Sequence, residues 1–196
     1  TDLDNIQFEA GGLNHFSILL QATYKDSGKD GYPLINKNFE GYYSDLVNDH
    51  EGFFSNAGAE RGLFFELFKR YGYLPITTDS HLGEYLSWAY SVADHDGILD
   101  FYDKYKKRCL SFFSNDGYEQ FFDMSHPEPH ERAIPIIESI VADLNMLEHA
   151  VNIKNENFIE CLPNDIVVEV PAIINKTGVH GKKLDNYPEP FGALLN

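Results

Sequence analysis

The first segment whose residues can do chemistry is GGLNHFS, from Gly11 to Ser17. The glycine pair Gly11-Gly12 predicts a bend between two strands that lie within residues 6–24. His15 then falls on the second strand, directly after the bend, where an imidazole can point into a cleft that the backbone approaches closely. A single histidine in an apolar strand more often has a purely structural role, so a functional role for His15 needs support from other residues.

The second segment is LPITTDSHLGEY, from Leu74 to Tyr85. It places Asp79, His81 and Glu84 within about one turn at the start of a predicted helix. Two carboxylates and an imidazole at this spacing suit general acid-base catalysis or the surroundings of a bound metal. Asp79 can instead be the residue that caps the following helix, as aspartate often does.

The third segment is SHPEPHER, at residues 125–132. His126 and His130 are four residues apart, but Pro127 and Pro129 are incompatible with the helix that would place both imidazoles on one face. The segment is therefore not a zincin motif, and a surface loop before a helix is the alternative to a binding role.

Composition excludes several classes of partner. The 196 residues carry 15 Lys+Arg against 31 Asp+Glu, a net charge of −16, so a nucleic acid or an anionic membrane surface would meet like charge. The length and the 43% hydrophobic content fit one folded domain. Only two cysteines are present, Cys109 and Cys161, and no apolar run reaches the roughly 18 residues of a membrane span. We expect a reduced, cytoplasmic setting.

Several familiar motifs are absent from the sequence. It contains no G-x-G-x-x-G, no P-loop, no nucleophile elbow and no Cys-x-x-Cys pair. Binding of a dinucleotide through the usual fingerprint and a cysteine-rich zinc site are therefore excluded.

The elements that must position these residues follow from the apolar periodicity. Residues 25–38 are predicted to form an exposed turn, and strands are predicted in HAVNIKN, NFIECLP and DIVVEVPAII near the C-terminus. Between these regions the spacing predicts four helices, near 63–71, 81–89, 98–113 and 135–144. Helices between strand-rich ends indicate an α+β domain.

The motifs together resemble a known family. GGLNHFS, YGYLP with ITTDSHLGEYLSW, HERAIPIIESI and LPNDIVVEVPAIINKTGV resemble, in order and spacing, the C-terminal half of glycoside hydrolase family 4. The resemblance covers nearly the whole chain. It implies an α+β fold like the C-terminal domain of lactate and malate dehydrogenases, with helices packed on a mostly antiparallel sheet. Residues 1–196 would then be one substrate- and metal-binding domain, without the family's N-terminal Rossmann half.

The resemblance also implies an activity, because this family uses NAD and Mn²⁺ to hydrolyse O-glycosyl bonds. Oxidation at C3 of the sugar acidifies the proton on C2, a base removes that proton, the glycosidic oxygen is eliminated, and water adds. The metal would bind the C2 and C3 oxygens, and the nucleotide would carry the hydride.

Individual roles carry over from the resemblance. His15 matches the metal-binding histidine, and Asn14 would position sugar hydroxyls. Asp79 is the nearest match to the residue that removes the C2 proton in members acting on unphosphorylated α-glycosides. Members acting on 6-phospho-sugars use a tyrosine base where this chain has Phe68, which implies an unphosphorylated substrate.

Four further residues match the galactosidase and galacturonidase branch of the family. His81 would be catalytic, and Glu84 would bind substrate from the same H-x-x-E-Y stretch. His130 and Glu131 match a His-Glu pair that opens a helix and would also bind substrate. The branch implies an α-galacturonide, α-galactoside or α-glucoside as substrate.

The expected partners are a carbohydrate, an N-terminal NAD-binding half and further copies of the chain as a homo-oligomer. The family's cysteine ligand of the metal lies in the absent half, so we expect His15 alone to hold Mn²⁺ weakly. The chain by itself would be inactive. The alternative is a non-catalytic module that binds sugar or only dimerises.

Overall fold

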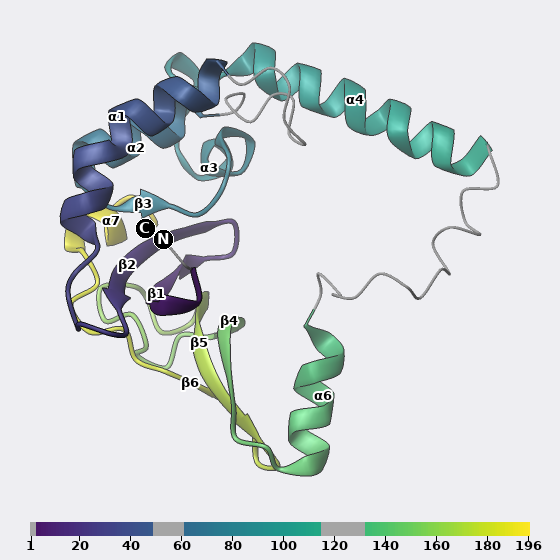
Figure 1. Cartoon of the computed structure of the whole chain (residues 1–196). Helices are drawn as coiled ribbons and strands as arrows, with labels where there is room; N and C mark the ends of the chain where they lie inside the picture. The colour runs from purple at the N-terminus through teal and green to yellow at the C-terminus, as the bar shows by residue number, and fades with distance from the viewer. Residues whose placement is uncertain (1–2, 49–60, 115–131) are drawn as a thin grey trace.

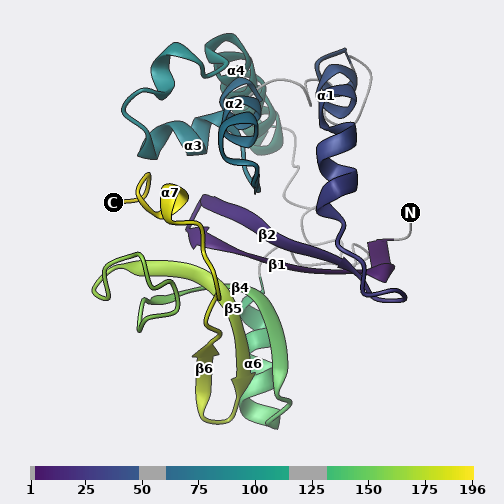
Figure 2. The same cartoon turned by 90° about the vertical axis from the view of Figure 1, so that its left-hand side faces the viewer.

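A computed structural model describes residues 3–48, 61–114 and 132–196. The strands form one sheet in the order β3-β2-β1-β5-β4, β6 pairs with β5, and the described ladders are antiparallel. Helices α1 to α4 lie on one side of the β1–β2 hairpin, and β4, β5, β6 and α6 lie on the other (Figures 1 and 2). This arrangement confirms the expected α+β class with helices on an antiparallel sheet.

The β1–β2 hairpin corrects the predicted bend. β1 (Ile6–Leu13) follows the short 3-10 turn η1 (Leu3–Asn5), continues through both glycines and pairs with β2 (Phe16–Tyr24). The reversal lies instead at residues 14–15. The glycines serve a close approach: a Cβ on Gly11 would come within 2.3 Å of the Leu184 side chain, and one on Gly12 within 2.3 Å of the Phe16 carbonyl oxygen.

Helix α1 (Tyr32–Asn48) replaces part of a region predicted to be a turn. The turn extends only to Gly31, because the Asp30 carboxylate accepts a hydrogen bond from the Tyr32 amide at 2.9 Å and starts the helix. Phe39 of α1 is buried and stacks on Phe68 of α2 with ring centroids 3.8 Å apart. The local pattern for this helix is weak, and packing against α2 stabilises it.

Three of the four predicted helices follow the predicted spacing, whereas the helix predicted near 81–89 ends at Tyr85, and a 3-10 turn begins at Ala89. α2 (Gly62–Tyr71) ends at Gly72, whose left-handed φ of 74° allows its amide to bond back to the Phe68 carbonyl. α4 (His95–Ser114) and α6 (Ala133–Ala142) confirm their predictions. Between α2 and α4 lie β3 (Leu74–Pro75), α3 (Asp79–Tyr85) and the 3-10 turn η2 (Ala89–Ser91).

The C-terminal strands are β4 (Met146–Lys154), β5 (Val167–Asn175) and β6 (Gly178–Gly181), followed by α7 (Glu189–Gly192). The strand predicted in NFIECLP is wrong. The fully buried Asn155 side chain donates to the carbonyls of Ile159, Leu162 and Pro163 and accepts from the Ile159 amide, which holds this segment as a loop.

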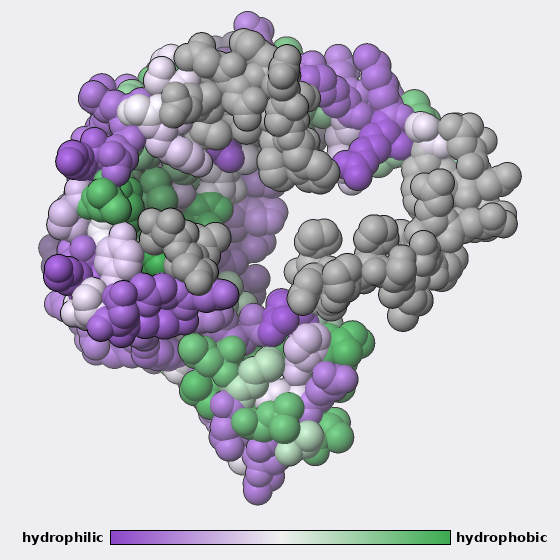
Figure 3. Space-filling model, viewed as in Figure 1, coloured by the Kyte–Doolittle hydropathy of each residue, from purple (hydrophilic) through white to green (hydrophobic). Residues whose placement is uncertain are grey.

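The main core lies where the helices meet the sheet. Its fully buried apolar side chains come from both, and include Phe16, Ile18, Leu63, Leu67, Leu82, Val168, Val170 and Phe191. A smaller cluster packs α6 on β5, where the Ser139 hydroxyl donates to the Ile174 carbonyl at 2.7 Å. Ile134, Ile137 and Val141 of α6 are exposed, and hydrophobic surface gathers at the lower end of the molecule in Figure 3. Among the described helices, none is both long and apolar enough to cross a membrane.

Candidate functional site

The turn between β1 and β2 presents His15 at the surface. His15 has a φ of 63°, in the left-handed region that few side chains adopt, and its neighbour Phe16 is fully buried. The Tyr85 hydroxyl donates to the Asn14 carbonyl at 2.5 Å, and the Tyr85 ring lies 5.4 Å from that of Phe16. Tyr85 therefore fixes the turn from the side of α3.

The other side of the turn is tied to β5. Gly12 pairs with Glu169, and the Ser17 hydroxyl donates to the Glu169 carboxylate at 2.7 Å. Ser17 is itself buried. The backbone that carries His15 is thus held between α3 and β5, and a side chain held in this way loses little freedom when it binds a ligand.

Helix α3 brings two more candidate ligands to His15. The imidazole rings of His15 and His81 have centroids 4.1 Å apart at a tilt of 46°. Glu84 lies one turn further along α3, with its Oε1 atom 3.8 Å from Nδ1 of His81. One ligand atom from each of the three residues lies within 4.8 Å of the others.

The chemistry of this cluster fits a metal ion. Nδ1 of His81 is shielded from solvent and has no hydrogen-bond partner, and leaving a polar atom in that state costs about 1–3 kcal/mol. Two imidazoles and a carboxylate are common ligands of divalent transition metals. Among the described residues, His15, His81 and Glu84 are the group of His, Cys, Asp or Glu side chains that lie close enough together to share one ion.

Asp79 belongs to the interior instead. Its side chain is fully buried, and its two oxygens accept hydrogen bonds from the amides of Leu63 at 2.8 Å, Phe64 at 2.9 Å and Asp94 at 3.0 Å. Burial raises the pKa of this carboxyl, while the three amides oppose the rise. The geometry favours the capping role that the sequence left open. The helix that Asp79 caps is α2, whose first amides it accepts from, because the N-cap position of α3 is occupied by Thr78.

Two residues at the site, Tyr85 and Glu169, were not predicted from the sequence. Tyr85 directly follows Glu84 in the H-x-x-E-Y stretch and Glu169 lies in the VVEVP run, so both belong to motifs that carry the family resemblance. Burial raises the pKa of Tyr85, and the carboxylates of Glu84 and Glu169 add to the rise. The hydroxyl is therefore kept protonated as the donor that holds the turn.

Of the other predicted residues, Asn14 is next to the cluster, Phe68 lies apart from it, and two lie outside the described part of the chain. Asn14 is exposed beside His15. Phe68 is buried among the aromatic rings of α1 and α2. His130 and Glu131 lie outside the described residues.

Comparison with known proteins gives consistent relatives. Residues 10–196 match the Family 4 glycosyl hydrolase C-terminal domain. An alpha-glucosidase of Erwinia rhapontici is 40% identical over 221 residues, which covers 100% of this chain and 47% of the relative. An alpha-galacturonidase of Thermoanaerobacterium saccharolyticum is 28% identical over 202 residues, covering 93% of this chain and 42% of the relative.

The solved structures agree on the fold. A 6-phospho-alpha-glucosidase from gut microorganisms, in complex with NAD and Mn²⁺, superposes with a TM-score of 0.61 at 20% identity, over 100% of this chain and 45% of that one. The chain thus spans slightly less than half the length of these relatives. It belongs to family 4 of the glycosyl hydrolases, and it corresponds to the C-terminal domain of that family.

Proposed function

We propose that this chain is the sugar- and metal-binding half of an NAD- and Mn²⁺-dependent enzyme that hydrolyses unphosphorylated α-glycosides. The observation that carries the proposal is the convergence of His15, His81 and Glu84 at the end of the β1–β2 hairpin, in a family 4 C-terminal domain. Bound at this cluster, a divalent ion would polarise the C2 and C3 oxygens of the sugar, and NAD⁺ would accept and return the C3 hydride.

The residues of this chain would hold and orient the sugar. The exposed Asn14 amide can donate to one hydroxyl and accept from another. Glu84 is 59% exposed and offers a second carboxylate oxygen to a hydroxyl. Asp79 is buried with both carboxylate oxygens hydrogen-bonded, so we assign it the role of supporting α2 and not that of removing the C2 proton.

The charges around the cluster favour a neutral sugar. Glu84 belongs to the cluster, and the Glu169 carboxylate accepts a hydrogen bond from Ser17 beside the turn that carries His15, so both add negative charge near the cluster. A sugar phosphate would meet repulsion, and a galacturonate carboxylate would meet it to a smaller degree. An α-glucoside is therefore the first substrate to test.

The proposed enzyme also includes parts beyond this domain. An N-terminal half would supply the NAD site and further groups around the metal, and copies of the chain would assemble as a homo-oligomer. The cysteines Cys109 and Cys161 are both free thiols, which agrees with a reducing cytoplasmic location.

Hydrolysis by the full-length natural protein tests the proposal. We expect release of nitrophenol from aryl α-glucosides when NAD⁺ and Mn²⁺ are both present, with slower release from the α-galacturonide and the 6-phosphorylated glucoside. In deuterated water the product should carry deuterium at C2. No hydrolysis of any unphosphorylated α-glycoside would overturn the proposal, as would hydrolysis that needs neither cofactor.

A further inference from the structure

We infer that His81 and Glu84 bind the divalent cation together with His15, so that this chain alone forms a three-ligand site. The inference deepens the proposed function, and rests on it only for the expectation that the ion is Mn²⁺. It replaces the sequence-based expectation of a weak site with one imidazole, and it gives His81 a ligand role in place of an acid-base role.

The spacing within α3 is that of two ligands of one ion. Residues three apart on a helix lie on the same face, and the distance between His81 Nδ1 and Glu84 Oε1 is 3.8 Å. This distance is too long for a hydrogen bond. Two atoms bound at about 2.1 Å to the same ion lie about 3–3.5 Å apart, so a small rotation of the exposed Glu84 side chain brings both into contact with an ion.

His15 supplies the third ligand from the turn between β1 and β2. Its ring centroid is 4.1 Å from that of His81, and the rings are tilted by 46°. With all three ligand atoms within 4.8 Å of one another, closing on an ion requires movements of only about 1 Å. The hydrogen bond from Tyr85 to the Asn14 carbonyl holds the His15 backbone in its left-handed conformation without the ion.

The unsatisfied Nδ1 atom of His81 supplies an independent argument. It has no hydrogen-bond partner although it is shielded from water, which is rare for a polar atom in a native protein. A bound cation satisfies it. Three protein ligands also leave positions open, and an ion in such a site can still bind substrate oxygens.

Titration of the metal-free 196-residue chain with Mn²⁺ tests the inference. Electron paramagnetic resonance of the unbound ion measures affinity directly, and the visible absorption of bound Co²⁺ reports nitrogen ligation. We expect one ion per chain. His81→Ala and Glu84→Gln should each weaken binding by about 10-fold or more, and His15→Ala by at least as much. His180→Ala is the matched control, because His180 lies in the β5–β6 hairpin, hydrogen-bonded to Thr177. The Mn²⁺ affinity of this variant should equal that of the unaltered chain.

The variants are expected to fold, since the His81 and Glu84 side chains are 36% and 59% exposed, and circular dichroism checks this. Unchanged Mn²⁺ affinity in His81→Ala or Glu84→Gln would overturn the inference, even if hydrolysis were lost. Tight binding that depends on all three residues would support it, even if the full-length protein hydrolysed no glycoside. Failure of this inference and failure of the proposed function are therefore separate results.

Discussion

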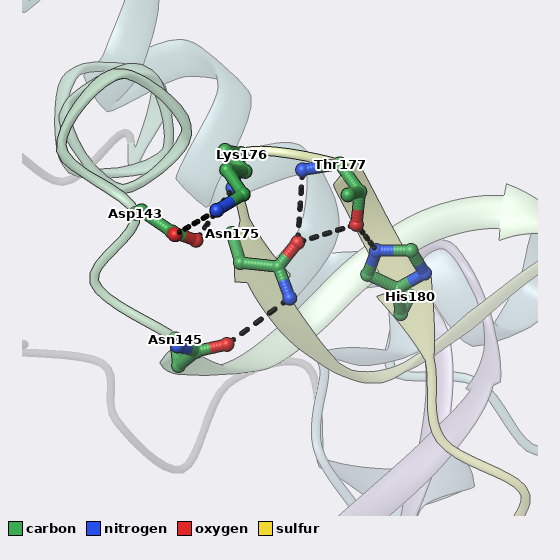
Figure 4. A network of polar contacts seen from close by, with 6 residues as sticks. All are labelled: Asp143, Asn145, Asn175, Lys176, Thr177 and His180. Atoms are coloured by element: carbon green, nitrogen blue, oxygen red, sulfur yellow. Dashed lines mark hydrogen bonds and ion pairs between the residues drawn. The ribbon is translucent and has the colours of Figure 1, made fainter.

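Two parts of the molecule gather polar side chains around a histidine, and they treat it differently. At the β5–β6 hairpin, His180 Nε2 lies 2.7 Å from the Thr177 hydroxyl, which donates in turn to Asn175. Figure 4 shows that the Asn175 amide donates in turn to Asn145, and that the ion pair between Lys176 and Asp143 lies beside this network. In the cluster formed by His15 of the β1–β2 turn with His81 and Glu84 of α3, by contrast, His81 Nδ1 has no hydrogen-bond partner.

The two clusters differ in whether their polar atoms have hydrogen-bond partners within the protein. In the β5–β6 network, hydrogen bonds and an ion pair join every side chain drawn in Figure 4. In the His15–His81–Glu84 cluster, by contrast, Nδ1 of His81 lies 3.8 Å from the Glu84 carboxylate, within ion-pair range, but makes no hydrogen bond. A polar cluster that is satisfied internally stabilises its fold, whereas one left unsatisfied holds its groups ready for a ligand.

The largest expected effect separates the two histidine clusters by activity. In the full-length enzyme, His15→Ala should lower turnover with Mn²⁺ by about 10²–10³-fold, because the ion loses a ligand where negative charge develops. His180→Ala should leave turnover unchanged, since its only described bond is within the β5–β6 network. Steady-state hydrolysis of an aryl α-glucoside measures both. Comparable losses in the two variants would contradict the distinction.

The next largest effect is on stability. Asp79→Ala should lower the free energy of unfolding by about 2–4 kcal/mol, since the buried amides of Leu63 and Phe64 and the partly buried amide of Asp94 lose their acceptor. Urea unfolding measures it. Asp79→Asn keeps one acceptor oxygen and should lose less. Where Asp79→Asn stays folded, Mn²⁺ affinity should be unchanged, and a specific loss of affinity or turnover at full stability would return Asp79 to the active site.

Asp79 also shows why sequence reasoning located the site only in part. Helical residues two apart point about 200° away from each other, whereas those three apart share a face. Asp79 therefore turns into the core beneath α2 while His81 and Glu84 turn toward His15. Their proximity in the sequence suggested that Asp79, His81 and Glu84 act together, but the helix brings only His81 and Glu84 to His15.

The fold was predictable where local signals were strong. Gly72 ended α2 as expected, and the apolar spacing of α4 and α6 gave their positions. α1 was missed because its stability comes from Phe39 packing on α2, which no local pattern reveals. The reversal at residues 14–15 was missed because the preceding glycines serve close approaches, Gly11 to the side chain of the distant Leu184 and Gly12 to the Phe16 carbonyl across the hairpin.

Metal binding should stabilise the chain by an intermediate amount. With Mn²⁺ at about 100 times its dissociation constant, the free energy of unfolding should rise by about 2.7 kcal/mol. A tenfold weaker site in His81→Ala should lose about 1.4 kcal/mol of this increment at the same concentration. Urea unfolding with and without Mn²⁺ measures the difference. An increment of the same size in the unaltered chain and in His81→Ala would show that the ion binds elsewhere.

The smallest effect compares one hydrogen bond at each histidine cluster. Tyr85→Phe removes the bond to the Asn14 carbonyl, and Thr177→Val removes the hydroxyl that joins Asn175 to His180. Each should cost about 0.5–1.5 kcal/mol of stability. Only Tyr85→Phe should also weaken Mn²⁺ binding, by a few-fold, because the turn that carries His15 then gains freedom that the ion must remove. Equal Mn²⁺ affinities in the two variants would mean that the buried Phe16 and the Ser17–Glu169 bond hold His15 without help from Tyr85.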